Sequence, residues 1–296
     1  MRPARILDCV TGAIIALLVV LFAGTTWRQR ETARRVDELR RPANTEREGV
    51  FTADDLEGLP APVRGYFENT LQEGRPYIDS VRLKQEGKLR LGDASSSWKP
   101  FTATQHVTVD PPGFFWNASI SLVPSVSLHI RDLFRDGDGS AAVSLYGVVP
   151  LDRADPSPEL NGAELVRYLA EAVWYPTALL PSEGVRWESI DAQTAKATIH
   201  HGDVSASLTF SINEDNEVTR VHTERRYRRV DGEFEPTPWS GYWRDYQTRD
   251  GVRIPMEGEV VWHPPDGDLE AWRGKVTEIR YDEDDRLRGG RLLGRR

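Results

Sequence analysis

The chain lacks the residue patterns on which several common kinds of site depend. It has one cysteine in 296 residues, which excludes an intramolecular disulfide framework and a cysteine-based zinc site. It contains no G-x-S-x-G motif and no glycine-rich phosphate loop. The six histidines show no H-x-H or H-E-x-x-H spacing, so we expect no metal and no cofactor. No motif therefore points directly to an enzyme.

Charge is missing from one stretch, residues 9–27, which lies between Asp8 and Arg28. A helix of this length spans roughly 28 Å, close to the roughly 30 Å of a bilayer's hydrocarbon core. Trp27 lies at the end where interfacial aromatic residues gather. The rival interpretation is a cleaved signal peptide, but no clear small-x-small cleavage site follows the apolar run. We therefore predict an uncleaved single-pass anchor, with membrane lipid as a partner.

The signals for the side of the membrane conflict. Two arginines precede the predicted span and six follow it closely, which by the positive-inside rule would place the large domain in the cytoplasm. The basic N-terminal region and the β-rich character of the domain favour export instead. Both alternatives stay open, with a slight preference for the outside of the cytoplasm.

The charge distribution divides the chain into four segments. The segment with the anchor (1–27), a charged stalk (28–49) and a tail expected to be disordered (282–296) together carry a net charge of +4. Because the whole chain carries −8, the remaining domain of residues 50–281 carries −12. Such an acidic domain repels phosphates, which argues against a nucleic-acid partner.

Within this domain the hydrophobic residues alternate with polar ones. Phe114, Trp116, Ala118 and Ile120 share one face of a predicted strand, and similar patterns recur in about a dozen segments separated by Asp-Gly and Asn-rich turns. Two segments, 60–71 and 162–174, have helical spacing instead. The pattern predicts a mainly β fold: a strongly curved antiparallel sheet, or half-barrel, with one or two helices packed in its concavity.

The second helical segment has a distinct polar side. Leu165, Leu169 and Val173 lie on its apolar side, whereas Glu164, Arg167, Tyr168, Glu171 and Tyr175 follow the opposite side. We expect this second side to face solvent or the rim of a cavity.

Several segments together resemble a prokaryotic family of unknown function whose members commonly have a hydrophobic N-terminal segment. They include PVRGYF (62–67), VRLKQEGKLRL (81–91), PPGFFWNASI (111–120) and WSGYW (239–243), and the resemblance covers roughly residues 58–281. The overall pattern is also similar to the half-barrel fold of periplasmic lipoprotein carriers and related lipid-binding proteins. That resemblance implies an apolar cavity covered by helices.

Eight of the nine tryptophans lie in the acidic domain, which suits an aromatic-lined cavity. The alternative is that they simply fill a β core. The predicted ligand-binding residues are Trp98, Trp116, Tyr168, Glu171, Trp174, Tyr175 and Trp187.

The resulting hypothesis is a membrane-anchored domain that binds or relays a hydrophobic ligand such as a lipid. One alternative is an envelope enzyme with an acid/base site, for which Glu171 with Glu188 or Asp191 is the candidate carboxylate pair. Another alternative is a membrane-tethered scaffold for an unidentified protein partner. The absence of catalytic motifs favours a binding protein over an enzyme.

Overall fold

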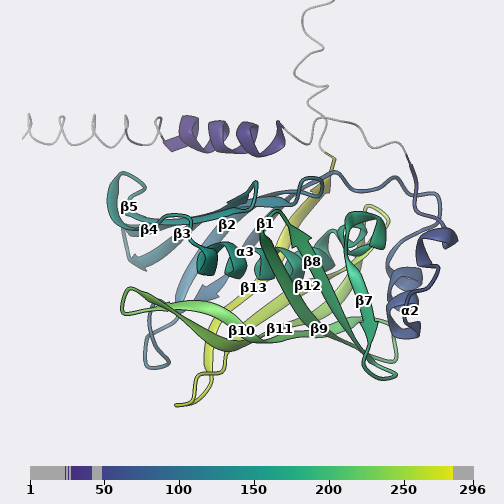
Figure 1. The fold of residues 1–296 in the computed structure, drawn as a ribbon. Coiled ribbons are helices and arrows are strands. Elements are labelled where there is room, and N and C mark those ends of the chain that lie inside the picture. Colours follow the sequence, from purple (N-terminus) through teal and green to yellow (C-terminus); the bar gives the residue numbers. More distant parts are fainter. Residues whose placement is uncertain (1–23, 25, 27, 42–48, 283–296) are drawn as a thin grey trace, which may run out of the picture.

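The computed structural model of this chain describes residues 24, 26, 28–41 and 49–282. Over these residues, thirteen strands form one antiparallel sheet in the order β6-β5-β4-β3-β2-β1-β13-β12-β11-β10-β9-β8-β7 (Figure 1). The strands are β1 (Ser80–Leu89), β2 (Lys99–Thr108), β3 (Gly113–Val123), β4 (Val126–Arg135), β5 (Asp138–Leu145), β6 (Val149–Ala154), β7 (Arg186–Ser189), β8 (Thr194–His201), β9 (Val204–Ile212), β10 (Val218–Val230), β11 (Glu233–Arg249), β12 (Val252–Trp262) and β13 (Leu269–Tyr281). The predicted half-barrel of about a dozen antiparallel strands is thus confirmed.

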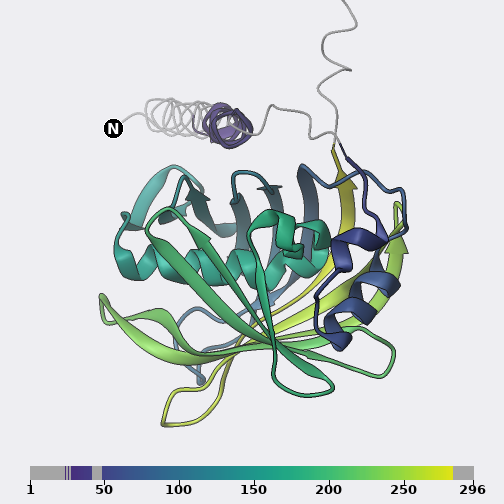
Figure 2. The same ribbon diagram turned by 45° about the vertical axis from the view of Figure 1, so that its right-hand side comes forward.

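Helix α3 (Pro158–Glu171) lies inside the curved sheet (Figure 2). It connects β6 to β7 by way of the short 3-10 helices η2 (Ala172–Trp174), η3 (Pro176–Leu179) and η4 (Pro181–Glu183). Because β6 and β7 are the two edges of the sheet, the connection between them crosses the concave side. In this position α3 packs against β9 and β10 on one side and β5 on the other.

The start of α3 follows from its local sequence. Ser157 is the N-cap, and its hydroxyl accepts a hydrogen bond from the backbone N–H of Leu160 at 3.2 Å. Pro158 occupies the first turn, where its missing N–H is harmless. The predicted helix is confirmed, but it begins four residues earlier than expected because of this cap.

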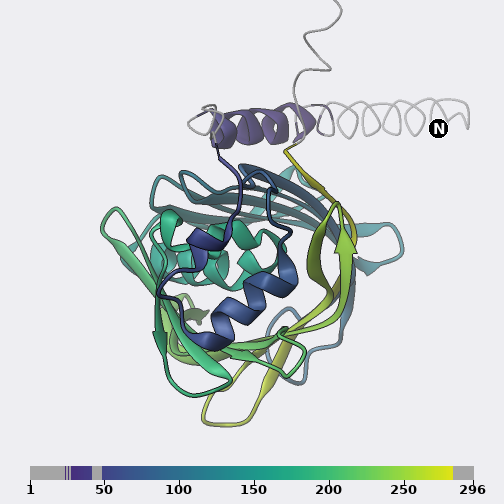
Figure 3. The ribbon, with the colours of Figure 1, turned by 90° about the vertical axis from the view of Figure 1, so that its right-hand side faces the viewer.

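Helix α2 (Ala61–Thr70) is the other predicted helix, and it lies across one open end of the sheet rather than in the concavity (Figure 3). Val63 and Phe67, which are four residues apart, are completely buried. The short η1 (Ala53–Leu56) precedes it. The buried faces of α2, α3 and the concave side of the sheet form one continuous hydrophobic core.

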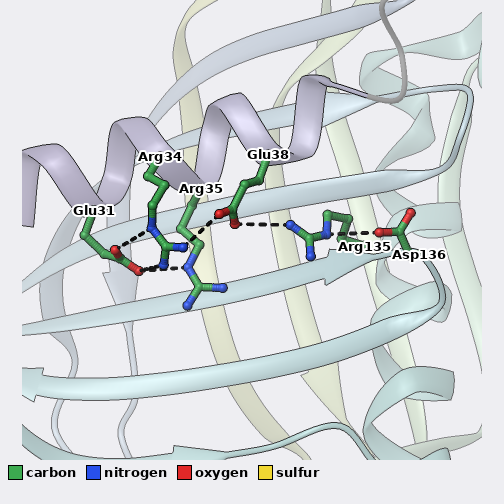
Figure 4. Close-up of polar contacts among 6 residues, drawn as sticks. All are labelled: Glu31, Arg34, Arg35, Glu38, Arg135 and Asp136. Atoms are coloured by element: carbon green, nitrogen blue, oxygen red, sulfur yellow. Dashed lines mark hydrogen bonds and ion pairs between the residues drawn. The ribbon is translucent and has the colours of Figure 1, made fainter.

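A further helix, residues 28–40, covers the convex side of the sheet over the first strands, and we call it the outer helix (Figures 1 and 3). Val36 and Leu39 pack on Phe115 of β3 and on Leu133. Glu38 pairs with Arg135 of β4 at 3.2 Å, and Glu31 pairs with Arg34 and Arg35 within the helix (Figure 4). The predicted stalk is therefore helical over much of its length and packs against the sheet.

The predicted membrane span, residues 9–27, lies outside the described residues except for Gly24 and Thr26, and the tail lies outside them after Asp282. Among the residues that the structure describes, no helix is both long and apolar enough to cross a membrane.

Candidate functional site

A cavity of about 240 Å³ lies between α3 and the concave face of the sheet. Its wall contains five tryptophans from four different elements: Trp116, Trp174, Trp239, Trp243 and Trp272. Leu89, Leu91, Ile130 and Val260 supply much of the remaining apolar lining. Charged side chains are present as well, namely Arg90, Asp132, Arg167, Glu171 and Arg226. The interior therefore combines an apolar space with a small number of ionic groups.

Two glycines allow the tryptophan rings to lie close to the sheet. Gly258 of β12 and Gly274 of β13 are paired across the sheet. A Cβ atom at Gly274 would lie 2.4 Å from Trp272, and one at Gly258 would lie 2.6 Å from Trp243. Any side chain at these positions would displace the rings. Glycine inside a strand is typical of such close approaches.

The charged groups of the cavity wall form a network around Arg167 of α3. Its guanidinium donates to Asp132 of β4 at 2.7 Å and to Glu171 at 2.9 Å. The second oxygen of Glu171 accepts a hydrogen bond from Gln105 at 2.6 Å. Burial alone would lower the pKa of Arg167, but the two carboxylates raise it by more than this amount, so the pKa lies above its usual value. The same guanidinium lies over the ring of Trp116, at 5.0 Å from its centroid.

Glu164, one turn before Arg167 on α3, is the least compensated acid of the interior. It is 6% exposed, and its Oε2 atom has no hydrogen-bond partner among the described residues. Burial, reinforced by the nearby charge of Asp132, raises its pKa to about 7. Glu164 does not line the cavity.

Three of the predicted site residues, Trp116, Glu171 and Trp174, line the cavity. Trp98 does not line the cavity, but the guanidinium of the wall residue Arg90 lies 4.6 Å from the centroid of its ring and that of Arg273 lies 5.3 Å away. Trp116 is oriented by a hydrogen bond from its indole N–H to Gln85 at 2.8 Å.

The other three predicted residues belong to the core. Tyr168 and Tyr175 are 1% and 0% exposed, and the Tyr175 hydroxyl donates to the carbonyl of Tyr168 at 2.7 Å. Trp187 donates to the carbonyl of Leu179 and packs edge-on against Phe210. None of the three is part of the cavity wall.

The sequence predicts that the polar side of this helix faces solvent or the rim of a cavity. It does not face solvent, and two of its residues, Arg167 and Glu171, line the cavity. Glu164 and Tyr168 are buried, and Arg167 and Glu171 keep only 15% and 13% of their side chains exposed. The reason is topological: α3 passes between the two halves of one curved sheet, so both of its sides meet strands.

Sequence reasoning missed Trp239, Trp243, Trp272 and Arg226 as wall residues. A signal existed for the first two, because W-S-G-Y-W places both tryptophans on one face of a strand with a glycine between them. No comparable signal marks Arg226, since it lies in the arginine-rich run ERRYRRV, which is typical of a solvent-exposed strand.

A second polar cluster on the convex side resembles a nucleophilic relay. The Ser240 hydroxyl lies 2.9 Å from Nε2 of His263, whose Nδ1 lies 2.7 Å from Asp268. Ser240 is 0% exposed, however, and also lies within 3.0 Å of His222 and of Arg220. A hydroxyl buried in this way cannot reach a substrate, so the cluster ties β10, β11 and the end of β12 together.

The cavity network likewise lacks the parts of an acid/base site. Both oxygens of Glu171 accept hydrogen bonds, one from Arg167 and the other from Gln105, so neither is left without a partner. The candidate partners Glu188 and Asp191 are exposed, on β7 and in the turn that follows it, whereas Glu171 is inside. Among the described residues, no group of three or more His, Cys, Asp or Glu side chains could hold a metal ion.

With this geometry established, comparison with known proteins identifies the family. The model of DUF6920, a family of unknown function, matches residues 57–281. The chain belongs to this family. The match confirms the resemblance that the sequence segments suggested. It also places the whole cavity, from Gln85 to Trp272, within the DUF6920 region.

Two solved structures resemble this DUF6920 chain at low identity. A LolA superfamily protein from Nitrosomonas europaea is 11% identical, with 76% of this chain and 96% of that chain covered and a TM-score of 0.36. A β-barrel-like protein of the domain of unknown function DUF1849 from Brucella abortus is 9% identical, with 69% and 98% covered and a TM-score of 0.23. No curated protein matches the chain.

Proposed function

We propose that the half-barrel binds a hydrophobic small molecule or lipid chain in the cavity beneath α3. The observation that carries this proposal is the lining: five tryptophan rings surround an unfilled space in an otherwise packed core. Protein interiors are normally close-packed, so an apolar space of this size is a candidate ligand site. Its volume is slightly below the roughly 300–1,000 Å³ usual for small-molecule sites, which suits one chain or one small ring system.

The wall also explains how such a ligand would be oriented. Trp174 and Trp243 meet edge-to-face at 5.0 Å, and Phe101 supports both Trp116 and Trp272. Rings held in this way offer large apolar surfaces that lose little conformational freedom on binding. The ionic network around Arg167 is internally paired, so it confines polar groups of the ligand to other parts of the wall.

Quenching of tryptophan fluorescence tests the proposal directly. The full chain in phosphatidylcholine nanodiscs is titrated with methyl 8-bromooctanoate, a neutral chain whose bromine quenches nearby indoles, and empty nanodiscs serve as the blank. We expect saturable quenching. Ala271 lines the cavity, so Ala271→Leu places extra carbon atoms in it and should weaken binding roughly tenfold.

The matched control is Ala142→Leu. Ala142 is a half-buried alanine of β5 that is paired with Arg131 and does not line the cavity. This variant should bind the ester as the natural chain does. Linear quenching without saturation, or equal weakening by both variants, would contradict a ligand site beneath α3.

We also propose that residues 9–27 anchor this domain in a membrane, with the domain outside the cytoplasm. The support is the uncharged apolar run that precedes the outer helix. Carbonate extraction of membranes should leave the chain in the pellet, and protease added to intact spheroplasts should digest residues 50–281. Release by carbonate would contradict the anchor. Digestion of these residues only after lysis of the spheroplasts would show that the domain lies in the cytoplasm.

A further inference from the structure

Arg226 of β10 differs from Arg167, another of the three arginines that line the cavity. Arg167 donates to two carboxylates, whereas Arg226 donates from Nε to the carbonyl oxygen of Ala163 at 3.3 Å. Among the described residues, no carboxylate is hydrogen-bonded to Arg226, although it lines the cavity. A guanidinium carries five N–H donors, so this side chain has donors left for a bound molecule.

Two aromatic rings hold this cation in place. The guanidinium carbon lies 4.8 Å from the centroid of Trp239 and 5.3 Å from that of Trp262. Burial lowers the pKa of Arg226 to about 10, and it therefore stays protonated at neutral pH. Aromatic faces stabilise a cation without neutralising it. A charge held in this way beside an apolar space favours an anion that enters from the cavity.

Glu164 is the nearest candidate for an internal counter-ion, and it does not fill that role by contact. Among the described residues, no hydrogen bond joins its Oε2 atom to an arginine, and it faces Gly139 of β5 from α3, outside the cavity wall. Its charge acts on Arg226 only through space, where it raises the pKa of the guanidinium against the effect of burial. The remaining carboxylates of the wall, Asp132 and Glu171, are taken by Arg167.

We propose that the cavity selects an amphiphile with one anionic group, a carboxylate or a phosphate, which pairs with Arg226 while the apolar part lies among the tryptophans. This inference rests on the proposed function, since it names the chemistry of the ligand in the same cavity. A guanidinium matches both oxyanions through paired N–H donors. The small volume favours a single chain over a lipid with several chains.

The test compares three probes that share one brominated chain: methyl 8-bromooctanoate, 8-bromooctanoate and 8-bromooctyl phosphate. Each is titrated into the full chain in phosphatidylcholine nanodiscs at pH 7.5, and tryptophan quenching gives its Kd. We expect at least one anion to bind about 10- to 100-fold more tightly than the neutral ester, the range that one charge-assisted contact supplies. Comparing the Kd values of the two anions shows whether the cavity prefers a carboxylate or a phosphate group.

Arg226→Gln should abolish this preference, so that neither anion binds this variant more tightly than the ester does. Arg225→Gln is the matched control, because it removes the same charge one residue away at an exposed position. It should retain the full preference. Arg226→Lys keeps the charge without the fork of donors, so it should retain part of the preference, and it provides a second variant where the glutamine variant fails to fold.

The outcomes separate this inference from the proposed function. Saturable binding of all three probes with equal Kd, or tighter binding of the ester, overturns the selection of an anion and leaves the hydrophobic site standing. An anion preference that survives in Arg226→Gln overturns the role of Arg226. Failure of every probe to bind the natural chain overturns both proposals.

Discussion

The curved sheet carries a helix on each of its faces, and the two helices are held by different forces. On the concave side, α3 is enclosed by strands, and most of its residues are buried. On the convex side, the outer helix contributes Val36 and Leu39 to a small apolar contact and otherwise relies on polar ones (Figure 4). The sheet can pack a helix on each face because successive side chains of a strand point to opposite faces, so one strand supplies contacts to both helices.

The spaces beneath the two helices differ in the same way. The inner cavity is lined by tryptophans, whereas the outer groove, about 1,020 Å³, is lined by basic and hydroxyl side chains and two histidines. His106 and His129 both lie in this groove, and their pKa values fall to about 4 because of burial and then of neighbouring arginines. We therefore expect α3 to contribute mainly to global stability, and we expect the docking of the outer helix to depend on the protonation of His106 and His129.

The largest difference should appear when one leucine is removed from each helix. Leu169 of α3 is 0% exposed within the main core, so Leu169→Ala should lower the free energy of unfolding by about 3–4 kcal/mol. Leu39→Ala removes a similar side chain from the outer helix and should change global stability by less than about 1 kcal/mol.

Urea denaturation measures the first quantity, and hydrogen exchange of residues 28–40 measures release of the outer helix in the second variant. Equal losses of global stability in the two variants would mean that both helices belong to one cooperative unit, against this account.

The second effect concerns Glu164, whose pKa of about 7 lies above the ordinary 4.5. Because the pKa of Glu164 is higher in the folded protein than in the unfolded chain, its contribution to the free energy of unfolding is fully present below pH 4.5. This contribution is lost as the pH rises through 7. The loss amounts to about 3 kcal/mol at most. Glu164→Gln should therefore be more stable than the natural chain at pH 8 and equal to it at pH 4.5.

Thermal denaturation at the two pH values checks this prediction. A stability difference that does not change between pH 4.5 and pH 8 would show that Glu164 is not held in its neutral form by burial.

A smaller effect is expected from His129 beneath the outer helix. Nη1 of Arg28 lies 2.7 Å from Nε2 of His129, Ser127 lies 3.5 Å from the same atom, and Arg131 adds a second positive charge. Burial, then Arg28 and Arg131, depress the pKa from 6.5 to about 4. The neutral form of His129 therefore stabilises the docked outer helix above pH 6.5, and this stabilisation is lost as the pH falls towards 4.

Docking of the outer helix should consequently weaken by about 1–2 kcal/mol between pH 6.5 and pH 5. Hydrogen exchange of residues 28–40, corrected for the intrinsic rate at each pH, measures this change. His129→Gln should flatten the dependence. A profile that is identical in the variant would assign the effect to another group, with His106 beside Arg40 and Arg82 the next to test.

The sequence predicted the fold better than the site because period-two alternation is a local property. Phe114, Trp116, Ala118 and Ile120 all face inward as expected. The cavity, by contrast, is assembled from residues that are far apart, such as Trp116 and Trp243. Whether a tryptophan lines a space or fills the core depends on its neighbours across the sheet, which alternation does not specify.

The buried arginines show the same limit. The two chemically distinct sides of α3 predict that Arg167 faces solvent or the rim of a cavity. Arg167 does line the cavity, but its side chain is largely buried because the helix is enclosed by strands. Arg226 lies in a run of arginines in which its neighbour Arg225 is exposed. Successive residues of a strand point to opposite faces, but the run itself does not indicate which of the two arginines points inward. Long-range topology decides such cases.

The central claim is that the cavity beneath α3 holds an apolar ligand, and native mass spectrometry tests it most directly. The full chain is kept in the lipids of the cells that express it by forming nanodiscs from their membranes, and it is released from these nanodiscs in the spectrometer. The account predicts that the natural chain carries one apolar molecule, identifiable after extraction with organic solvent, and that Ala271→Leu carries much less of it while Ala142→Leu carries the same amount. A natural chain that is consistently empty, or equal occupancy in all three proteins, would contradict a ligand site beneath α3.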